Sequence, residues 1–396
     1  MMFCEKPIGE IADVTKLAGF EFTKYIKYNE TGEIIALRAL NLRKGELDLS
    51  DIKRIDRSVS EGLTRSKLYE NDIILTYTGN GYGDCAIIEE NDKYHLAPNI
   101  CKIVPNRALV EPYFLYSYIR SNDFYKQMSS NMTGSGQPTI PMKTIRTLKV
   151  PVPQMEIQKK IANIIQAINL KLRTNRAINE NLEQQAQAIF ANEFLSLESL
   201  PSGWKRGNLM DIADYLNGLA MQKYRPIADE IGIHVLKIKE LRQGHCDANS
   251  ELCSPNIKTN YIIHNGDVIF SWSGSLLVDF WCGGICGLNQ HLFKVTSNMY
   301  DKWFYYAWTK HHLERFIAVA ADKATTMGHI KRAELSKAEV LIPNKTDYNR
   351  IGSLLHPIYD LIISNRIENR KLAEIRDALL PKLMSGEIDI SEVDYE

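Results

Sequence analysis

Two stretches of the chain carry the same spacing of apolar side chains. In residues 154–195 and again in residues 344–384, apolar residues recur at steps that alternate between four and three. This spacing is the heptad seam of a helix that packs against a partner helix. The seam positions of the first stretch are Ile161, Ile165, Ile168, Leu172, Asn175, Asn179, Leu182 and Ile189. Those of the second are Ile351, Leu355, Ile358, Ile362, Asn365, Asn369, Leu372 and Leu379. The pattern predicts a duplicated long helix.

Asparagine interrupts both seams at the same two places. The second list repeats the first 190 residues later (351 against 161), so the interruptions belong to the repeat. A polar residue at a seam position costs stability and fixes the register of paired helices. We therefore expect an antiparallel pair in which Asn175 lies opposite Asn365, with Asn179 and Asn369 beside them. The alternatives are a parallel pair, or asparagines that are exposed because the helices separate at this point.

The segments outside the two helices also match each other. Residues 71–79 correspond to residues 266–274, and residues 150–153 correspond to residues 340–343. Apolar and β-branched runs between turn residues predict strands, and apolar residues at helical spacing predict helices. In the first segment the expected elements are a short strand or turn at Gly9–Val14, strands at Ile34–Leu40, Ile73–Tyr77, Ala86–Ile88 and Ile100–Val104, and a helix at Glu111–Met128. The offset between the copies drifts along the chain, which indicates insertions and deletions in loops.

The repeat predicts an α+β protein. We expect two repeated mixed α/β regions, each followed by a long helix, with the two helices paired as an antiparallel coiled coil. The expected boundaries are a first region at 1–153, a first helix at 154–197, a second region at 198–343, and a second helix with a C-terminal tail at 344–396. Each helix exposes a long apolar stripe and needs a partner, and the other copy is the nearest one. A repeated framework with different loops suits a protein that makes two contacts of the same kind with two different targets.

The charge of the whole chain does not indicate a nucleic-acid partner. Lysine and arginine together number 48, as do aspartate and glutamate, so DNA binding must rest on local patches or on partner chains that supply charge. No apolar run approaches the ~20 residues of a membrane span, and the first residues do not form a signal peptide. These features, with an odd cysteine count of 7, predict free thiols and a cytoplasmic protein.

Sequence motifs for catalysis are missing. The chain has no P-loop, no G-x-S-x-G nucleophile elbow, no H-E-x-x-H zinc motif and no Asn/Asp-Pro-Pro-Tyr/Phe run of amino-methyltransferases. Gly79–Gly83 is rich in glycine, but it follows a strand without opening a clear helix. A turn, or a loop that another backbone approaches closely, is therefore favoured over a nucleotide-binding loop. We expect no catalytic residue in this chain.

Cysteines of the second half are candidates for a zinc site. The residues concerned are Cys246, Cys253, Cys282, Cys286 and His245. Their spacings, C-x6-C and C-x3-C, are not those of a paired zinc knuckle, so buried free thiols are the favoured interpretation. His311 and His312 lie on an expected helix, where a surface pair is favoured over metal ligands. We expect no metal site.

Binding chemistry is what the remaining polar residues suggest. Basic groups hold DNA phosphates, while amides and hydroxyls read base edges. The candidate DNA-binding residues of the first half are Arg38, Asn41, Arg43, Lys44, Thr78, Asn80, Tyr82, Ser135, Gln137, Thr139 and Lys143. Those of the second half are Lys237, Lys239, Arg242, Trp272, Ser273, Ser275, Thr325, Thr326, His329 and Lys331. For any single lysine, a solvated loop surface is the simpler interpretation.

Motifs across nearly the whole chain resemble one known family. The strand Val150–Pro153 is rich in proline and leads directly into Met155–Ile161. The loop Thr-Gly-Ser-Gly-Gln-Pro at 133–138, the run Asp72–Thr76 and the C-terminal run Leu379–Ile388 complete the pattern. In these features the chain resembles the specificity subunits of type I restriction-modification systems.

The resemblance implies a subunit without catalytic activity. In that family each target-recognition domain reads one half of a split DNA site, and the conserved helices separate the domains and dock two methyltransferase subunits. Those partners bind S-adenosylmethionine and methylate adenine, and restriction subunits join them for cleavage. The resemblance thus implies target-recognition domains at 1–153 and 198–343, double-stranded DNA with a bipartite site as ligand, methyltransferase and restriction subunits as partners, no membrane, and no cofactor held by this chain.

Two other functions stay open at this point. One is a specificity subunit of a type IIB-like restriction system, which neighbouring genes would distinguish. The other is an adaptor built on an internal coiled coil without a role in DNA binding, and the divergent loops on a repeated framework argue against it. DNA binding at low salt, with and without a methyltransferase subunit, discriminates between recognition and adaptor functions.

Overall fold

Two compact units make up the chain. The computed structural model describes residues 3–43, 45–134, 138–322, 330 and 332–393. Unit 1 comprises residues 1–170 and 374–396, and unit 2 comprises residues 171–373. Both long helices contribute one part to each unit, so that each unit contains a globular region and a piece of both helices.

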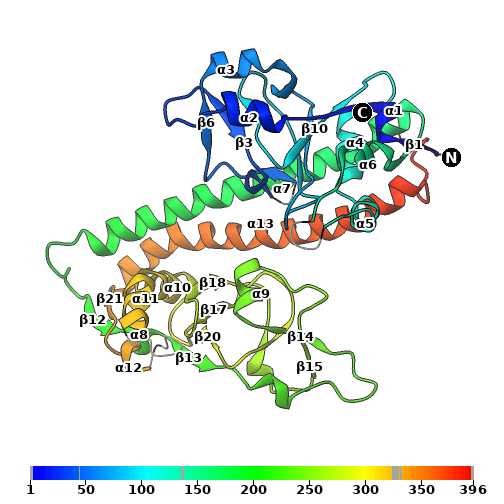
Figure 1. The fold of residues 1–396 in the computed structure, drawn as a ribbon. Helices are drawn as coiled ribbons and strands as arrows, with labels where there is room; N and C mark the ends of the chain where they lie inside the picture. Colours follow the sequence, from blue (N-terminus) through cyan, green and yellow to red (C-terminus); the bar gives the residue numbers. More distant parts are fainter. Residues whose placement is uncertain (1–2, 44, 135–137, 323–329, 331, 394–396) are drawn as a thin grey trace. The chain divides into compact units, whose positions relative to one another are not determined.

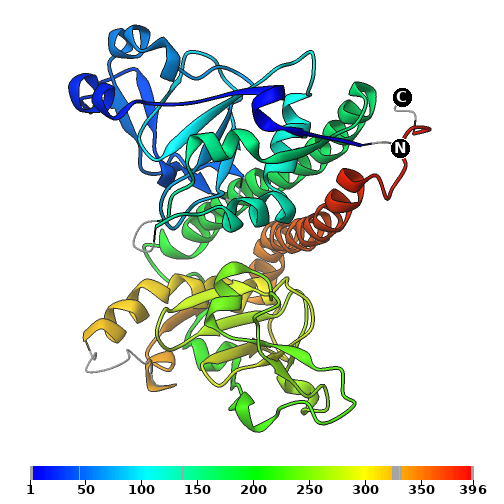
Figure 2. The same cartoon turned by 45° about the vertical axis from the view of Figure 1, so that its right-hand side comes forward.

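The two long helices lie where the heptad seams predict them. Helix α7 spans Met155–Phe190, and a π-helical turn at Ala191–Leu195 continues it. Helix α13 spans Lys345–Ser385, and the Asn344 side-chain oxygen accepts a hydrogen bond from the Asp347 N–H in its first turn. Figure 2 shows both helices as unbroken ribbons, green for α7 and orange to red for α13. The presence of both helices is confirmed. None of the described helices is long and apolar enough to cross a bilayer.

Unit 1 is built on several small sheets (Figure 1). The four-stranded antiparallel sheet has the order β2-β10-β7-β8, with strands at Ala12–Lys16, Ile100–Pro105, Ile73–Thr76 and Cys85–Ile87. The three-stranded sheet has the order β6-β3-β9, with strands at Lys53–Ile55, Ile34–Leu37 and Tyr94–Leu96. The two-stranded sheets are β1 (Cys4–Pro7) with β11 (Lys149–Val152), and β4 (Leu42–Arg43) with β5 (Glu46–Leu47). The shorter helices are α1 (Ile8–Ile11), α2 (Gly19–Tyr25), α3 (Arg57–Gly62), α4 (Pro112–Ile119), α5 (Asn122–Ser130) and α6 (Met142–Thr147).

Unit 2 repeats this plan. Its four-stranded antiparallel sheet has the order β13-β20-β17-β18, with strands at Asp214–Asn217, Leu292–Thr296, Val268–Ser271 and Leu277–Phe280. The second sheet has the order β15-β14-β19-β16, with strands at Leu252–Cys253, Ile233–Leu236, Cys286–Leu288 and Ile262–Ile263. The two-stranded sheet pairs β12 (Lys205–Asn208) with β21 (Glu339–Ile342). The shorter helices are α8 (Leu209–Ile212), α9 (Ile238–Gln243), α10 (Lys302–His311), α11 (Leu313–Asp322) and α12 (Arg332–Leu335). Two repeated mixed α/β regions are therefore confirmed.

Several expected elements are wrong in their extent. The helix expected at 111–128 is two helices, α4 and α5, because the Ser121 hydroxyl accepts a hydrogen bond from the Phe124 N–H (3.2 Å) and starts a new helix. The strand expected at 34–40 ends at Leu37, since a 3₁₀ helix at Ala39–Asn41 follows it. The segment 9–14 begins inside α1 and enters β2. Local side-chain capping produces the first of these breaks.

The repeat extends to polar contacts within the sheets. In unit 1, Lys102 Nζ of β10 lies 3.7 Å from Asp72 Oδ2. In unit 2, Lys294 Nζ of β20 lies 2.8 Å from Asp267 Oδ2. Each ammonium also donates a hydrogen bond to a backbone carbonyl. Such pairing is what permits a lysine to lie on an inner strand.

The long helices share cores with the globular regions. In unit 1, Ile161 and Ile165 of α7 and Leu383 of α13 belong to the same apolar core as the buried face of α4. In unit 2, Leu355 and Ile362 of α13 belong to the core formed by the aromatic residues of α10. Full burial of one such aliphatic side chain contributes about 1.5–3 kcal/mol. Each region is therefore fixed to its own part of the helices.

His312 is the exception to the expected surface pair of histidines. His311 is exposed, but His312 is only 9% exposed. Its Nε2 lies 2.8 Å from the Glu339 carbonyl oxygen, and its ring stacks on Trp308. The expectation is wrong for His312 because the residue that directly follows α10 packs against the first residue of β21. Burial lowers the pKa of His312 below its ordinary value.

The stability of the protein should therefore fall as the pH drops below about 6.5. Because the folded pKa of His312 is depressed, the unfolded chain binds this proton more readily. The stabilisation is fully present above the ordinary histidine pKa of ~6.5 and is lost as the pH falls from there through the depressed pKa of the folded protein, at up to about 1.4 kcal/mol per pH unit. Thermal unfolding of the wild type and of His312→Gln, which keeps a donor but does not titrate, measures the effect. An equal pH slope in both proteins would contradict it.

Candidate nucleic-acid interface

Two loops of unit 1 that are distant in sequence lie against each other. They are the loop that joins β7 to β8 and the loop that precedes α6. The Ile140 N–H donates a hydrogen bond to the Tyr77 carbonyl (3.0 Å), and Thr139 Oγ1 lies 3.4 Å from Thr78 Oγ1. The structure therefore brings together Thr78 and Thr139, which the sequence places 61 residues apart.

The glycine-rich loop is a turn between antiparallel strands. Gly79 and Gly83 have φ angles of +90° and +89°, a region that glycine adopts without steric cost. β8 begins at Cys85, and no helix follows the loop. The nucleotide-loop alternative is therefore wrong. Asn80 at the tip of this turn is exposed.

An aromatic pair borders this turn. Tyr82 stacks on Tyr125 of α5 with ring centroids 5.3 Å apart, and the two hydroxyl oxygens lie 2.6 Å apart. Tyr125 is 44% exposed. It was not among the sequence candidates, although a tyrosine on the polar face of a helix is a signal that could have indicated it. A flat, exposed ring with a hydroxyl at its edge offers both stacking and a hydrogen bond.

The basic candidates near β3 are bound to neighbouring groups. Arg38 donates a hydrogen bond to the Asp51 carbonyl (2.8 Å) and lies 3.0 Å from the Asp51 carboxylate. Asn41 is fully buried, and its side chain holds Asp48 and Asp51 carbonyls and the Arg38 N–H. Asn41 therefore shapes the loop from inside. Arg43 is exposed and lies 3.3 Å from the Asp48 carboxylate.

The corresponding loops of unit 2 meet in the same way. The Ile330 N–H donates a hydrogen bond to the Trp272 carbonyl (3.1 Å), as Ile140 does to Tyr77 in unit 1. The Trp272 indole donates to Asn217 Oδ1 (3.0 Å). Ser273 is buried, and its hydroxyl lies 3.1 Å from His291 Nδ1. Trp272 and Ser273 thus belong to one polar cluster.

Sequence reasoning missed three members of this cluster, Asn217, Gln290 and His291. The Gln290 side-chain amide lies 3.3 Å from His291 Nε2. The two residues lie between β19 and β20, where a run of Asn-Gln-His interrupts two apolar strands. That interruption was a usable signal. Side chains with amide and imidazole groups, held in place by each other, are suited to reading hydrogen-bonding ligands.

The basic candidates near β14 are mostly paired with carboxylates. Lys237 forms an ion pair with Glu251. Lys239 Nζ lies 2.9 Å from Asp247 Oδ2, and hydrogen bonding from Lys239 lowers the pKa of Asp247 to about 2. Arg242, also on α9, is exposed. Of these three cations, Arg242 is therefore the one most available to a ligand.

Other candidates are exposed or lie outside the described residues. Lys143 on α6 and Ser275 after β17 are exposed. The candidates outside the described residues are Lys44, Ser135, Gln137, Thr325, Thr326, His329 and Lys331. All seven cysteines are free thiols. Among the residues that the structure describes, no three metal-ligating side chains gather in one place.

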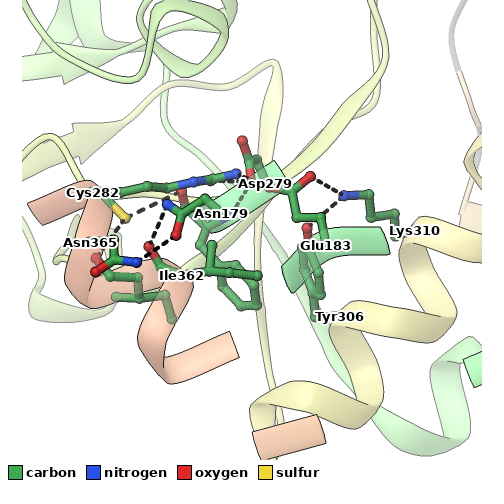
Figure 3. A network of polar contacts seen from close by, with 11 residues as sticks. Asn179, Glu183, Asp279, Cys282, Tyr306, Lys310, Ile362 and Asn365 are labelled. Carbon is green, nitrogen blue, oxygen red and sulfur yellow. Dashed lines mark hydrogen bonds and ion pairs between the residues drawn. The ribbon is translucent and has the colours of Figure 1, made fainter. Parts of the chain in front are cut away.

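The seam asparagines meet inside unit 2, but in a different register from the one expected. Asn175 Nδ2 donates to Asn369 Oδ1, and Asn365 Nδ2 donates to Asn179 Oδ1, both at 2.9 Å. Figure 3 shows Asn179 and Asn365 facing each other. The expectation that Asn175 lies opposite Asn365 is wrong, because partner numbers fall on α13 as they rise on α7. Asn175, Asn179 and Asn365 are at most 9% exposed, so the alternative of exposed asparagines is also wrong.

The other seam positions divide into buried and partly buried residues. The buried ones are Ile161, Ile165, Leu172, Ile351, Leu355 and Ile362. The partly buried ones are Ile168, Leu182, Ile189, Ile358, Leu372 and Leu379. The apolar seam positions are therefore all at least partly buried.

Arg366 of α13 connects both helices to the sheet of unit 2. Its guanidinium nitrogens lie 2.6 Å from Asp279 Oδ1 of β18 and 2.7 Å from Glu183 Oε1 of α7. Lys310 of α10 lies 3.8 Å from Glu183 (Figure 3). The side chains of Arg366, Asp279 and Glu183 are 27%, 26% and 30% exposed. This network connects four elements of unit 2, namely α7, α10, α13 and β18.

The two regions repeat one framework, in which the same backbone hydrogen bond joins two polar loops. A family model described as the type I restriction modification DNA specificity domain matches residues 3–184 and 201–376. These two matches cover most of the chain. The chain therefore belongs to the type I restriction-modification DNA specificity family.

Known members of this family are similar to the chain over most of its length. The type I restriction enzyme MjaIX specificity subunit of Methanocaldococcus jannaschii is 26% identical, over 74% of this chain and 72% of the relative. The HindI specificity subunit of Haemophilus influenzae is 20% identical over 93% and 96%. The crystal structure of a type I system S subunit from M. genitalium has a TM-score of 0.62 with 13% identity, covering 96% of both chains, which supports the fold.

Proposed function

We propose that this chain is the non-catalytic DNA-recognition subunit of a type I restriction-modification complex, and that each of its regions reads one half of a bipartite site. The observation that carries the proposal is the repeated loop arrangement. The same backbone hydrogen bond joins two loops in each unit, from Ile140 to Tyr77 and from Ile330 to Trp272. The side chains around these bonds differ between the units, which suits two different half-sites.

The reading side chains of the first half-site lie around the β7–β8 turn. Asn80 is exposed at its tip, and the stacked ring of Tyr82 stands beside it. An asparagine amide recognises adenine by two hydrogen bonds, and one such pair discriminates by about 1–3 kcal/mol. Thr78 and Thr139 meet beside this turn. Ser135 and Gln137, which lie outside the described residues, are assigned to the same half-site from the sequence. Lys143 is an exposed cation suited to phosphates. Arg43 is exposed but already paired with Asp48, so it is a secondary contact.

The second half-site is read by the polar cluster of unit 2. Trp272, Ser273 and His291 are connected through hydrogen bonds, and Ser275 is exposed beside them. Arg242 supplies an exposed cation for phosphate. We assign Thr325, Thr326, His329 and Lys331 to the same half-site from the sequence, because they lie outside the described residues. Lys237 and Lys239 are secondary contacts, because each is already paired with a carboxylate.

The long helices form an antiparallel coiled coil that sets the spacer. On this basis we assign target-recognition domains to 1–153 and 198–343, and conserved-region helices to 154–197 and 344–396. Besides the asparagine bonds, the pairs Lys171–Glu368 and Arg350–Glu193 support the direction, because low numbers on α7 meet high numbers on α13. Both pairs lie within unit 2.

Two methyltransferase subunits dock on the outward faces of these helices. Leu354 and Leu361 of α13 and Ile178 of α7 are 40–45% exposed, and large apolar side chains on a solvent face suit a protein partner. S-adenosylmethionine binds to those partners, and restriction subunits complete the complex for cleavage. The absence of catalytic sequence motifs in this chain agrees with this division of labour.

Single substitutions in the two clusters test the proposal. Asn80→Ala should relax base preference in one half-site only, and His291→Ala should relax it in the other half-site only. Loss of one base contact reduces discrimination by roughly 5- to 150-fold. Methylome sequencing of cells that express each variant with the methyltransferase subunit measures both half-sites at once.

Each variant carries its own control, because the unaffected half-site reports folding and assembly. Glu90→Ala, in an exposed loop, should leave both half-sites unchanged. If both variants altered the same half-site, or if neither altered any base preference, the assignment of one half-site to each cluster would be wrong.

A further inference from the structure

Two cysteines of unit 2 lie within reach of each other. Cys246 Sγ is 3.5 Å from Cys286 Sγ. Cys286 is 1% exposed in β19, an inner strand of its sheet, whereas Cys246 is partly exposed in the segment that follows α9. Neither residue belongs to the clusters assigned above to DNA recognition. Within the part of the chain that the structure describes, no group of ligands that could hold zinc surrounds these cysteines. Their proximity therefore needs another explanation.

The two thiols differ in reactivity. Hydrogen bonding with the Cys286 thiol lowers the pKa of Cys246. The same contact, together with burial, raises the pKa of Cys286. A thiolate, not a thiol, attacks disulfides. Cys246 is therefore the group that meets a reagent from solvent first, and Cys286 is the group placed to react with it afterwards.

We propose that Cys246 and Cys286 form a reversible disulfide by exchange with a low-molecular-weight disulfide such as oxidised glutathione. The Cys246 thiolate attacks one sulfur of the reagent, its S–S bond breaks, and one glutathione leaves as a thiolate. Cys286 then gives up its proton and attacks Cys246 Sγ, and the second glutathione leaves. The pair of cysteines loses two electrons and two protons, and one glutathione disulfide becomes two glutathione thiols.

The surrounding backbone permits this closure. A disulfide requires sulfur atoms ~2.05 Å apart, so the present separation must shorten by about 1.5 Å. β19 is held between β14 and β16, so the movement falls on the Cys246 segment. Gly244, with a φ of +79°, begins that segment, and no heavy atom stands within 4 Å of where its Cβ would lie. Oxidation would fasten the end of α9 to the sheet.

Peptide mapping of the full-length protein tests the proposal. The protein is treated with oxidised glutathione, remaining thiols are alkylated, and non-reducing digests are analysed by mass spectrometry. The expected product is a pair of peptides joined through Cys246 and Cys286, which a reducing agent separates. Oxidation should also raise the melting temperature by roughly 5 °C, because the bond closes a 40-residue loop (246 to 286).

Serine variants make the mapping specific. Cys246→Ser should abolish the joined peptides and leave Cys286 unmodified, because the buried thiol is not accessible alone. In Cys286→Ser, Cys246 should instead keep one glutathione. Cys282→Ser, at a buried cysteine of the same unit, should leave the joined pair intact. A stable glutathione adduct on wild-type Cys246, a bond between Cys286 and Cys253, or full alkylation of both residues would each overturn the proposal.

Discussion

Inserting one heptad into both long helices is expected to lengthen the DNA spacer by about 3 base pairs. Seven helical residues add about 10.5 Å, and one base pair rises 3.4 Å. The insertions belong between the two seam asparagines of each helix, at 177 and 367. Seven residues rotate an α-helix by only ~20° from a whole number of turns, so the apolar seam of each helix stays in phase. Both half-sites should keep their sequence, and methylome sequencing reads the half-sites and the spacer together.

The matched control is an insertion of seven residues into α7 alone. This insertion shifts one helix against the other, so the two hydrogen-bonded asparagine pairs cannot both form and buried amides lose their partners. Each buried polar group left without a hydrogen bond destabilises the protein by about 1–3 kcal/mol. This variant should unfold at a lower temperature and lose methylation. A double insertion that methylates DNA at the original spacing would show that the helices do not set the spacer.

Replacing Arg366 with methionine is expected to destabilise unit 2 by roughly 2–3 kcal/mol. The substitution leaves the carboxylates of Asp279 and Glu183 without their shared cation. Breaking a fully buried ion pair costs about 3–5 kcal/mol. Because these side chains are 26–30% exposed, solvent screens part of that cost. Chemical unfolding followed by tryptophan fluorescence measures the change in the free energy of unfolding, since Trp303 and Trp308 lie in the apolar core of unit 2.

Arg206→Met provides the comparison. Arg206 pairs with Glu339 in the same unit, but the two side chains are 62% and 57% exposed. An exposed pair contributes about 0–1 kcal/mol. Equal destabilisation by the two substitutions would mean that Arg366 acts as one more surface charge and not as a connection between helices and sheet.

The long helices could be predicted from sequence because their signal is local and repeated. A seam of apolar residues fixes helical phase over many turns, and the second copy supplies an independent reading of the same signal. The expected register was wrong for a geometric reason. In an antiparallel pair, the first asparagine of one helix meets the second of the other, so Asn175 meets Asn369. The antiparallel direction, together with the equal spacing of the asparagines in both helices, already implied this pairing.

The candidate interface was predictable in outline only. Thr78, Asn80 and Thr139 stood out because polar and glycine residues gather in loops after strands. Asn41 was misleading, since the sequence does not distinguish an exposed amide from one that caps its own loop. His291 was missed although the run Asn-Gln-His interrupts two apolar strands. Its contact with Ser273 could not be read from the sequence, because the sheet brings these two residues together.

The two-stranded sheets have a consequence for how such proteins diversify. β1 pairs with β11, and β12 pairs with β21, so each region begins and ends at one ribbon beside a long helix. Genetic recombination within the codons of that ribbon could replace everything between its strands while the rest of the gene stays unchanged. Since one subunit would direct both modification and cleavage, such an event would redirect both activities at once.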